Sequence, residues 1–188
     1  MIFTETSLQG AYVIGLEKRG DDRGFFARVF CRREFEQHGL VTEFVQMNNS
    51  LSGQKGTLRG MHYQLAPKAE TKLVRCIRGA LYDVILDLRP GSSTFGKSFG
   101  IELSAENRLM LYIPKGFAHG FLTLTDGVEA FYFADEFYAP ELERGVRWND
   151  PRFAIAWPTA PAALSDKDRD ARDFDPGYHL AVDSKTSR

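Results

Sequence analysis

The sequence has 188 residues, of which 43% are apolar and 13% are aromatic, and its formal net charge is −1. This length is enough for one domain with a well-buried core. The near-zero charge argues against a general nucleic-acid binder, because such proteins carry a strong excess of Lys and Arg.

The cysteines and the N-terminal segment indicate the cellular setting. Cys31 and Cys76 are too few for a disulfide framework and lack the spacing of metal ligands. The first ten residues lack the basic region and the apolar run of a secretion signal. No apolar run approaches the roughly 18 residues that would cross a bilayer. We therefore expect a cytoplasmic protein with no membrane or nucleic-acid partner.

The elements predicted in chain order are mostly short strands. Residues 11–30 hold two apolar stretches around the turn Arg-Gly-Asp-Asp-Arg-Gly. Residues 31–40 predict a short charged helix that ends at Gly39. Further strand-like runs, separated by Gly and Pro, follow at 43–52, 56–65, 72–88 (with a turn at Gly79), 98–104, 108–114, 116–125 and 128–138.

This arrangement predicts an all-β fold. Short strands at fairly even spacing are typical of an antiparallel sandwich or barrel. A doubly wound α/β fold is disfavoured, because strands do not alternate with long helices. After residue 158 the chain becomes rich in Ala and Pro and then acidic. We expect one domain over residues 1–176 and a loose C-terminal tail over residues 177–188.

The segment TLRGMHYQL, residues 57–65, places charged residues within a strand pattern. Strict alternation would put Arg59 and His62 on opposite faces of the strand. They can serve one site only if a bulge or a strand end at Gly60 interrupts the alternation. Arg59, together with Arg19 and Arg23, lies beside a Gly-rich turn, and guanidinium groups there could clamp a phosphate.

Charged residues also recur on neighbouring strands that otherwise look core-forming. Lys72 shares a face with Val74, and Asp83 shares a face with Ile85 and Asp87. A barrel with a polar, ligand-filled interior accommodates this pattern better than a dry sandwich does.

Each candidate residue also has an ordinary structural interpretation. His62 fits a general base, a metal ligand or a core histidine. The sequence contains no His-x-His pair, which disfavours a metal site and favours acid–base chemistry. His119 fits a turn histidine, and Lys72 fits a solvated residue at a strand edge. Tyr132 fits either an aromatic cluster or a phenol that faces a cavity and donates a proton.

The segment LSDKDRD, residues 164–170, predicts a solvated acidic loop. Alternatively, Asp166, Asp168 or Asp170 folds back to hold the second nitrogen of a histidine, which would fix its tautomer. The residues alone leave these three aspartates and Asp83 open as that partner.

Seven strings occur along the chain in this order: DDRGFF, FVQMNNS, GTLRGMHYQ, KLVRCIRGALYDVILDLRPGSSTFG, LYIPKGFAHGF, FYAPELERGVRWNDP and IAWP. Together they resemble the dTDP-4-dehydrorhamnose 3,5-epimerase family of cupin-type enzymes, over residues 2–168. The resemblance implies a jelly-roll β-barrel, a homodimer whose N-terminal strands pair with the partner, and no metal or organic cofactor. The implied substrate is a nucleoside-diphosphate 4-keto-6-deoxyhexose, which loses a proton beside the ketone and regains one on the opposite face, at C3 and C5.

Carried over by position, the resemblance also implies roles for the candidates. His62 resembles the general base and Asp168 its partner, while Tyr132 resembles the acid that protonates the other face. Lys72 and Arg59 resemble the groups around the C4 oxygen and the phosphates. The other implied substrate contacts are Arg23, Phe26, Arg28, Gln46, Asn48, His119, Tyr138, Glu143 and Lys167.

Four positions depart from the pattern that the resemblance implies. Arg28 stands where glutamate is common, Asn49 where histidine is common, Glu70 where glutamine is common and Phe133 where lysine is common. The changed charges leave the exact sugar and nucleotide open. A mono-epimerase that acts at C3 or C5 alone, on a different nucleotide sugar, is the alternative. The catalytic residue set argues against a silent binding barrel, and the missing His-x-His against a metal-dependent oxygenase.

Overall fold

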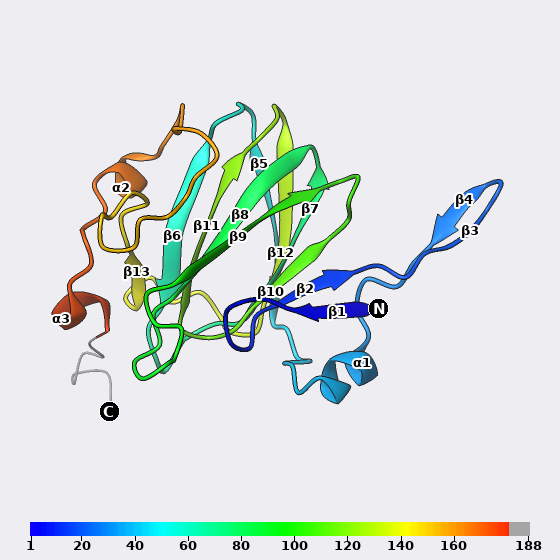
Figure 1. Ribbon diagram of the computed structural model, residues 1–188, viewed down its shortest axis with the longest axis horizontal. Coiled ribbons are helices and arrows are strands. Elements are labelled where there is room, and N and C mark those ends of the chain that lie inside the picture. Colours follow the sequence, from blue (N-terminus) through cyan, green and yellow to red (C-terminus); the bar gives the residue numbers. More distant parts are fainter. Residues whose placement is uncertain (181–188) are drawn as a thin grey trace.

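The computed structural model describes residues 1–180, most of which lie in or around two antiparallel sheets (Figure 1). The first sheet has six strands in the order β1-β2-β10-β7-β12-β5, and the second has five in the order β13-β6-β11-β8-β9. The all-β expectation is confirmed. The strands are β1 (Ile2–Glu5), β2 (Tyr12–Gly15), β3 (Arg19–Asp21), β4 (Gly24–Phe26), β5 (Gln46–Ser52), β6 (Leu58–Gln64), β7 (Lys72–Arg78), β8 (Ala80–Asp87), β9 (Ser98–Ser104), β10 (Met110–Ile113), β11 (Phe117–Thr123), β12 (Val128–Ala134) and β13 (Glu143–Gly145).

Apolar side chains from both sheets meet between them and form the main core. The strands β7, β10 and β12 contribute from the first sheet, and β8, β9 and β11 from the second. The fully buried members include Val74, Cys76, Leu81, Ile85, Leu103, Leu111, Val128 and Ala130. Burial of one such side chain contributes about 1.5–3 kcal/mol. This core fills one part of the space between the sheets, and polar residues line the remainder.

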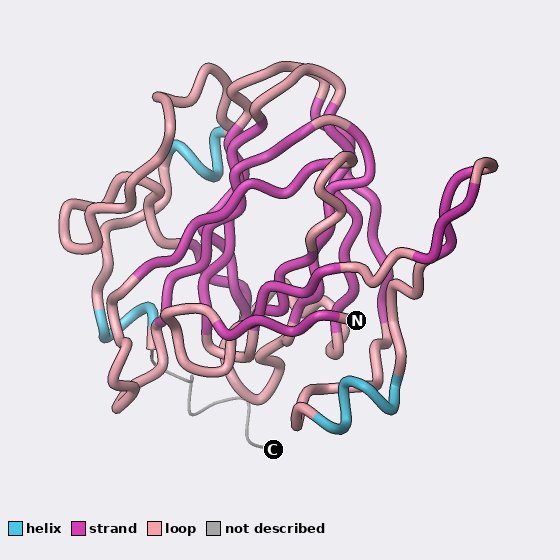
Figure 2. The backbone as a smooth tube through the Cα atoms, turned by 45° about the vertical axis from the view of Figure 1, so that its right-hand side comes forward, coloured by secondary structure: helices cyan, strands magenta, loops and turns pink. Residues whose placement is uncertain are grey.

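The outer face of each sheet is covered by a different segment. Helix α1 (Arg32–Gln37) packs Phe35 against the first sheet, beside Leu73 and Tyr112. The expected end of this helix is confirmed, since Gly39 has φ +66° and donates its N–H to the carbonyl of Glu36. The C-terminal segment covers the second sheet on the opposite side of the molecule (Figure 2).

The expected all-β fold includes a few short helices, but the sequence did not place two of them, which lie in the C-terminal segment. Helix α2 (Asp166–Arg169) lies where an acidic loop was predicted, and helix α3 (Pro176–His179) lies at the start of the predicted tail. His179 is fully buried and stacks on Phe174. The prediction of a loose tail is therefore wrong for residues 177–180, because burial of aromatic side chains holds them to the domain. Residues 181–188 of that predicted tail lie outside the described residues.

The hairpin of β3 and β4 projects away from both sheets (Figure 1). Its tip carries Arg23, whose side chain is 89% exposed, and Phe26 is 69% exposed. The edge strand β5 lies in the first sheet and exposes Met47 and Leu51. Over residues 1–180, no helix is both long and apolar enough to cross a membrane.

Candidate active site

A bulge in β6 brings Arg59 and His62 to the same face of the second sheet. His119 of β11 pairs with His62, and Phe121 pairs with Arg59. The three residue steps from 59 to 62 on β6 therefore lie opposite only two steps, from 119 to 121, on β11. The extra residue falls at Gly60, which has φ +131°. A Cβ at Gly60 would lie 2.5 Å from the backbone of β11, so no larger residue fits. The predicted break in alternation at Gly60 is confirmed.

Two cavities lie between the sheets, with volumes of about 330 Å³ and about 490 Å³. His62, Lys72 and Tyr132 line both cavities. The first cavity is also lined by Ser50, Arg59, Val74, His119, Phe121, Ala130, Ser165, Lys167 and Asp168. The second cavity is also lined by Gln46, Asn48, Tyr63, Gln64, Glu70, Ala134, Tyr138 and Glu143. Side chains from both sheets therefore converge where the cavities meet, and α2 contributes Lys167 and Asp168 to the first cavity.

Asp168 of helix α2 is the aspartate that holds His62. Its Oδ1 lies 2.6 Å from His62 Nε2, although the two residues are 106 positions apart. Ser165 caps the helix by accepting a hydrogen bond from the Asp168 N–H. Asp168 is 3% exposed. Burial raises the pKa of its carboxyl, but the hydrogen bond and the charge of His62 outweigh burial and hold this pKa below its usual value.

The pairing with Asp168 selects one tautomer of His62. An ionised carboxylate only accepts hydrogen bonds, so His62 Nε2 must carry the proton that Asp168 receives. In the neutral ring Nδ1 then has a free lone pair. Among the described residues, no side chain or backbone group hydrogen-bonds Nδ1. The ring that lines both cavities is therefore prepared to accept a proton at Nδ1.

A second His–Asp pair lies beside the first. His119 Nε2 is 3.0 Å from both carboxylate oxygens of Asp83, and Asp83 is fully buried. Asp83, which the sequence left open as a partner of His62, thus belongs to His119 instead. Its signal in the sequence is a carboxylate within the apolar run ALYDVILDL, on the same face as Ile85. This pair fixes the orientation of the His119 ring on the wall of the first cavity.

Lys72 and Tyr132 come from neighbouring strands of the first sheet. Lys72 Nζ forms an ion pair of 2.9 Å with Glu70 Oε1. Burial, and next the negative charge of Glu70, raises the pKa of Tyr132, whereas Arg59 acts to lower it. The phenol of Tyr132 is therefore protonated at neutral pH, and Phe133 points to the opposite face, where it packs near α1.

The second cavity has a wall of hydrogen-bonded polar groups. Glu143 accepts hydrogen bonds from Tyr138 Oη at 2.8 Å and Lys167 Nζ at 2.6 Å. Burial raises the pKa of Glu143, but the hydrogen bonds from Lys167 and Tyr138 outweigh burial. This pKa therefore lies below its usual value. Gln46 Oε1 accepts the backbone N–H of Tyr138. Asn48 lines the same cavity.

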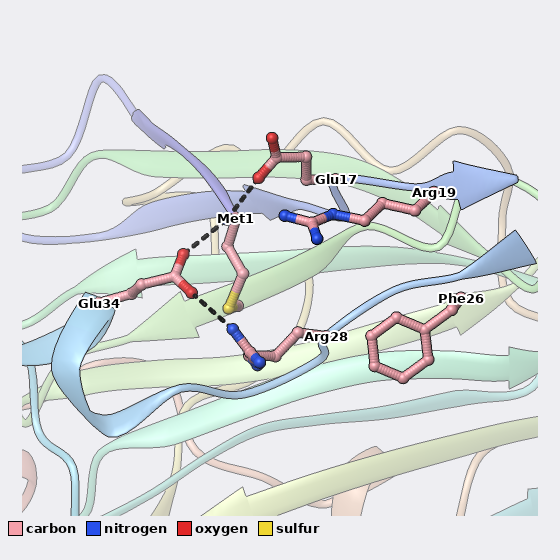
Figure 3. Close-up of a pocket in the computed structure, with 6 residues that line it drawn as sticks. All are labelled: Met1, Glu17, Arg19, Phe26, Arg28 and Glu34. Atoms are coloured by element: carbon pink, nitrogen blue, oxygen red, sulfur yellow. Dashed lines mark hydrogen bonds and ion pairs between the residues drawn. The ribbon is translucent and has the colours of Figure 1, made fainter.

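Three of the predicted substrate contacts lie away from both cavities of the same chain. Arg23 bonds Asp21 at the hairpin tip. Phe26 and Arg28 lie at the base of the hairpin, in a small pocket with Met1 and Glu34 (Figure 3). Arg28 forms an ion pair of 3.8 Å with Glu34 there. Arg59 does reach the first cavity, where Nε donates to Ser52.

Within residues 1–180, no three His, Cys, Asp or Glu side chains are grouped so that they could hold a metal ion. The site instead combines an oriented imidazole, a lysine ammonium and a protonated phenol around one interior space. This set of groups suits general acid–base chemistry on a bound organic substrate, which is the chemistry of isomerases that move protons.

Comparisons with known proteins identify the family within this class. The family model described as dTDP-4-dehydrorhamnose 3,5-epimerase matches residues 5–175. The dTDP-4-dehydrorhamnose 3,5-epimerase of Escherichia coli K12 is 51% identical over 160 residues, which cover 83% of this chain and 86% of the relative. The chain belongs to the dTDP-4-dehydrorhamnose 3,5-epimerase family.

Solved structures agree with this assignment and with the predicted jelly-roll barrel. The 3,5-epimerase of Elizabethkingia anophelis superposes with a TM-score of 0.90 at 43% identity, covering 93% of this chain and 96% of that one. A 3,5-epimerase from Legionella pneumophila, solved in complex with dTDP-4-keto-L-rhamnose, gives a TM-score of 0.85 at 40% identity, with 92% of each chain covered. The cupin-type epimerase fold expected from the sequence is confirmed.

Proposed function

We propose that the protein converts dTDP-4-dehydro-6-deoxy-D-glucose to dTDP-4-dehydro-L-rhamnose by inverting C3 and C5. The observation that carries this proposal is the convergence of His62, Lys72 and Tyr132 where the two cavities meet. Inversion needs two proton-bearing groups on different sides of the sugar, because a single base returns the proton to the face from which it came. His62 on β6 and Tyr132 on β12 lie on different sheets and supply two such groups.

In the proposed reaction His62 is the base. Its Nδ1 takes the proton from the carbon beside the ketone, and the C–H electrons form a C=C bond while the carbonyl electrons move to the C4 oxygen. Asp168 holds the ring in the required tautomer and stabilises the imidazolium that forms. A positioned base of this kind contributes roughly 10²–10⁴-fold to the rate.

Lys72 stabilises the enolate that forms at the C4 oxygen. Its ammonium group lies in a partly desolvated cavity, where a hydrogen bond to a developing oxyanion is far stronger than in water. One such donor is worth about 2.7–4 kcal/mol of transition-state stabilisation.

Tyr132 completes the inversion as the acid. Its protonated phenol gives a proton to the carbon on the face opposite His62, and the enolate electrons return to the carbonyl. The raised pKa of Tyr132 supports this role, because the phenol holds its proton until the enolate forms. Solvent then restores both groups. The same pair acts first at one carbon beside the ketone and then at the other.

The two cavities fit the two parts of a nucleotide sugar. We assign the sugar to the first cavity, which also contains Asp168 and His119, and the nucleotide to the second. The second cavity offers the amides of Gln46 and Asn48 and the aromatic ring of Tyr138. The diphosphate then lies between the two cavities, where Lys167 of the first cavity pairs with Glu143 of the second. Arg59 adds positive charge to the first cavity. We assign His119 and Glu143 to substrate contacts in the same space.

We propose a homodimer in which the β3–β4 hairpin reaches the substrate site of the partner. This places Arg23, Phe26 and Arg28 at a nucleotide sugar, although they lie far from their own chain's cavities. The exposure of the hairpin and of Met47 and Leu51 on the edge strand β5 supports this, since an edge strand and apolar surface favour pairing with a second copy. We also propose a cytoplasmic location, because free Cys31 and Cys76 suit a reducing compartment.

Product analysis tests the proposed stereochemistry. The purified protein is incubated with dTDP-4-dehydro-6-deoxy-D-glucose, the ketone is reduced with borohydride, and the hexoses released by acid are separated. Double inversion gives rhamnose and 6-deoxytalose. Recovery of 6-deoxyglucose and fucose alone contradicts the proposal. Products inverted at one carbon only would favour the mono-epimerase.

A further inference from the structure

An acidic side chain lies inside the substrate site beside the lysine. Glu70 Oε1 is 2.9 Å from Lys72 Nζ, and each side chain is only 13% exposed. Over residues 1–180, neither group forms another ion pair. A carboxylate next to the group that must stabilise an enolate is unexpected, because its negative charge opposes the charge that forms on the C4 oxygen. Glutamine is common at this position in the pattern that the resemblance implies, so the ion pair distinguishes this chain.

The backbone fixes the two side chains on the same face. Thr71 lies between them, is 2% exposed and donates its backbone N–H to Asp135 Oδ1 at 2.6 Å. Because side chains alternate in an extended chain, Glu70 and Lys72 both point inward when Thr71 points outward. Glu70 lines the second cavity and Lys72 lines both. The extended chain that leads into β7 therefore places Glu70 and Lys72 on the same side.

Lysine has a long flexible stem, and an ammonium group held by one contact loses much of that freedom. Held by Glu70, the ammonium sits at the junction of the cavities and retains two further protons for a substrate oxygen. Other charged or titratable groups also face this space. They are Arg59, His62 and Tyr63 from β6, His119 from β11, Tyr132 from β12, Tyr138 after β12, Glu143 from β13, and Lys167 and Asp168 from α2.

We propose that Glu70 is a positioning residue for the epimerisation, which anchors the Lys72 ammonium beside the C4 oxygen. This rests on the proposed function. Glu70 also affects the acid of the site, because its charge is the second contribution, after burial, that raises the pKa of Tyr132. Removal of that charge then lowers the pKa of Tyr132 and moves the alkaline loss of activity to lower pH.

The test compares two variants that lose the same charge. Glu70→Gln keeps the shape and an acceptor oxygen but not the charge. Glu136→Gln is the matched control, since Glu136 pairs with Lys68 at 3.2 Å and lines neither cavity. We expect Glu70→Gln to lower kcat about tenfold, with KM within about twofold, and to shift the alkaline limb to lower pH. We expect Glu136→Gln to match the wild type in all three measurements.

A raised KM with unchanged kcat would show that Glu70 only binds substrate, and an unchanged pH profile and kcat would leave it no role. Either result overturns the proposal. A second measurement does not depend on turnover: the rate at which acetic anhydride modifies each lysine, followed by mass spectrometry. Loss of the ion pair should raise the rate at Lys72 about three- to tenfold and leave the other lysines unchanged. If the wild type is inactive but Glu70→Gln still raises the modification rate at Lys72, the proposed function is contradicted and the anchoring of Lys72 by Glu70 stands. An unchanged rate at Lys72 would contradict the anchoring.

Discussion

Asp168 and His62 are 106 positions apart in the sequence and 2.6 Å apart in the structure. The helix that carries Asp168 has only four residues, and the serine before it caps its first turn. The interaction between them selects the histidine tautomer whose Nδ1 can accept a proton. In the proposed reaction, proton abstraction therefore depends on a segment that covers the barrel and is not part of either sheet.

Removal of the Asp168 charge should slow proton abstraction without weakening substrate binding. We expect Asp168→Asn to lower kcat about 10²–10⁴-fold, because the amide also supports the wrong tautomer of His62. We expect KM for the nucleotide sugar to change little. Steady-state kinetics with Asp166→Asn as the control measure this effect, since Asp166 lies on the same helix and, within residues 1–180, its side chain is bonded only to Arg169. Equal losses in both variants would mean that α2 matters only for folding.

Lys72→Met should separate binding from enolate stabilisation. The variant keeps an unbranched side chain but loses the donor, so we expect kcat to fall about 10²–10³-fold. Lys68→Met, which removes an ammonium outside both cavities, is the control. Comparable kcat in the two variants would contradict the role of Lys72.

Asp87 should stabilise the fold in a manner that depends on pH. Burial raises the pKa of Asp87, but hydrogen bonds from Arg89, Ser92 and Thr94 outweigh burial and lower it to about 2. A depressed carboxyl pKa contributes stability above the unfolded value, which for aspartate is 3.8, and this stability is lost as pH falls toward 2. The expected contribution at neutral pH is about 2 kcal/mol.

Urea unfolding of the wild type and Asp87→Asn at pH 7 and at pH 3 measures this contribution. The difference in unfolding free energy between the two proteins should shrink at the lower pH. A difference that stays constant would assign the effect to packing and not to the charge.

Mixed dimers should show whether Arg23 acts on the partner's site. Arg23→Ala and His62→Ala are each expected to be weakly active as pure proteins. If the hairpin acts across the dimer, a mixed dimer has one site with both residues intact. Unfolding and refolding an equal mixture should then recover about a quarter of the wild-type activity, because half of the dimers are mixed and each has one intact site. No recovery would mean that Arg23 does not act in the partner's site.

Much of this fold could be predicted because its strands carry their own signals. The run over residues 72–88 divides at Gly79 as expected, and the break at Gly60 was predicted from the alternation of TLRGMHYQL. The short strands β1 and β13 were missed, since their sequences IFTE and ERG do not alternate between apolar and polar residues. Helix α3 was missed although Asp175 caps it and Pro176 begins it, because its four residues are too few to show a helical period.

The site was predicted less completely, for a physical reason. Residue type and strand face identified Lys72 and Tyr132 as groups that could face a cavity. The resemblance supplied the pairing of His62 with Asp168, which residue patterns alone left open among four aspartates. The partnership of Asp83 with His119 depends on the register of β8 against β11, and the sequence does not state that register.

Proton exchange in heavy water tests whether His62 is the base and Tyr132 the acid of the reaction. Proton NMR of dTDP-4-dehydro-6-deoxy-D-glucose would follow the C3 and C5 signals with the wild type, His62→Ala and Tyr132→Phe. We expect loss of both signals with the wild type and no exchange with His62→Ala. We expect Tyr132→Phe to exchange protons without forming the inverted product, because His62 still works on its own face. Exchange by His62→Ala at the wild-type rate would contradict the role of His62, and inversion at the wild-type rate by Tyr132→Phe would contradict the role of Tyr132.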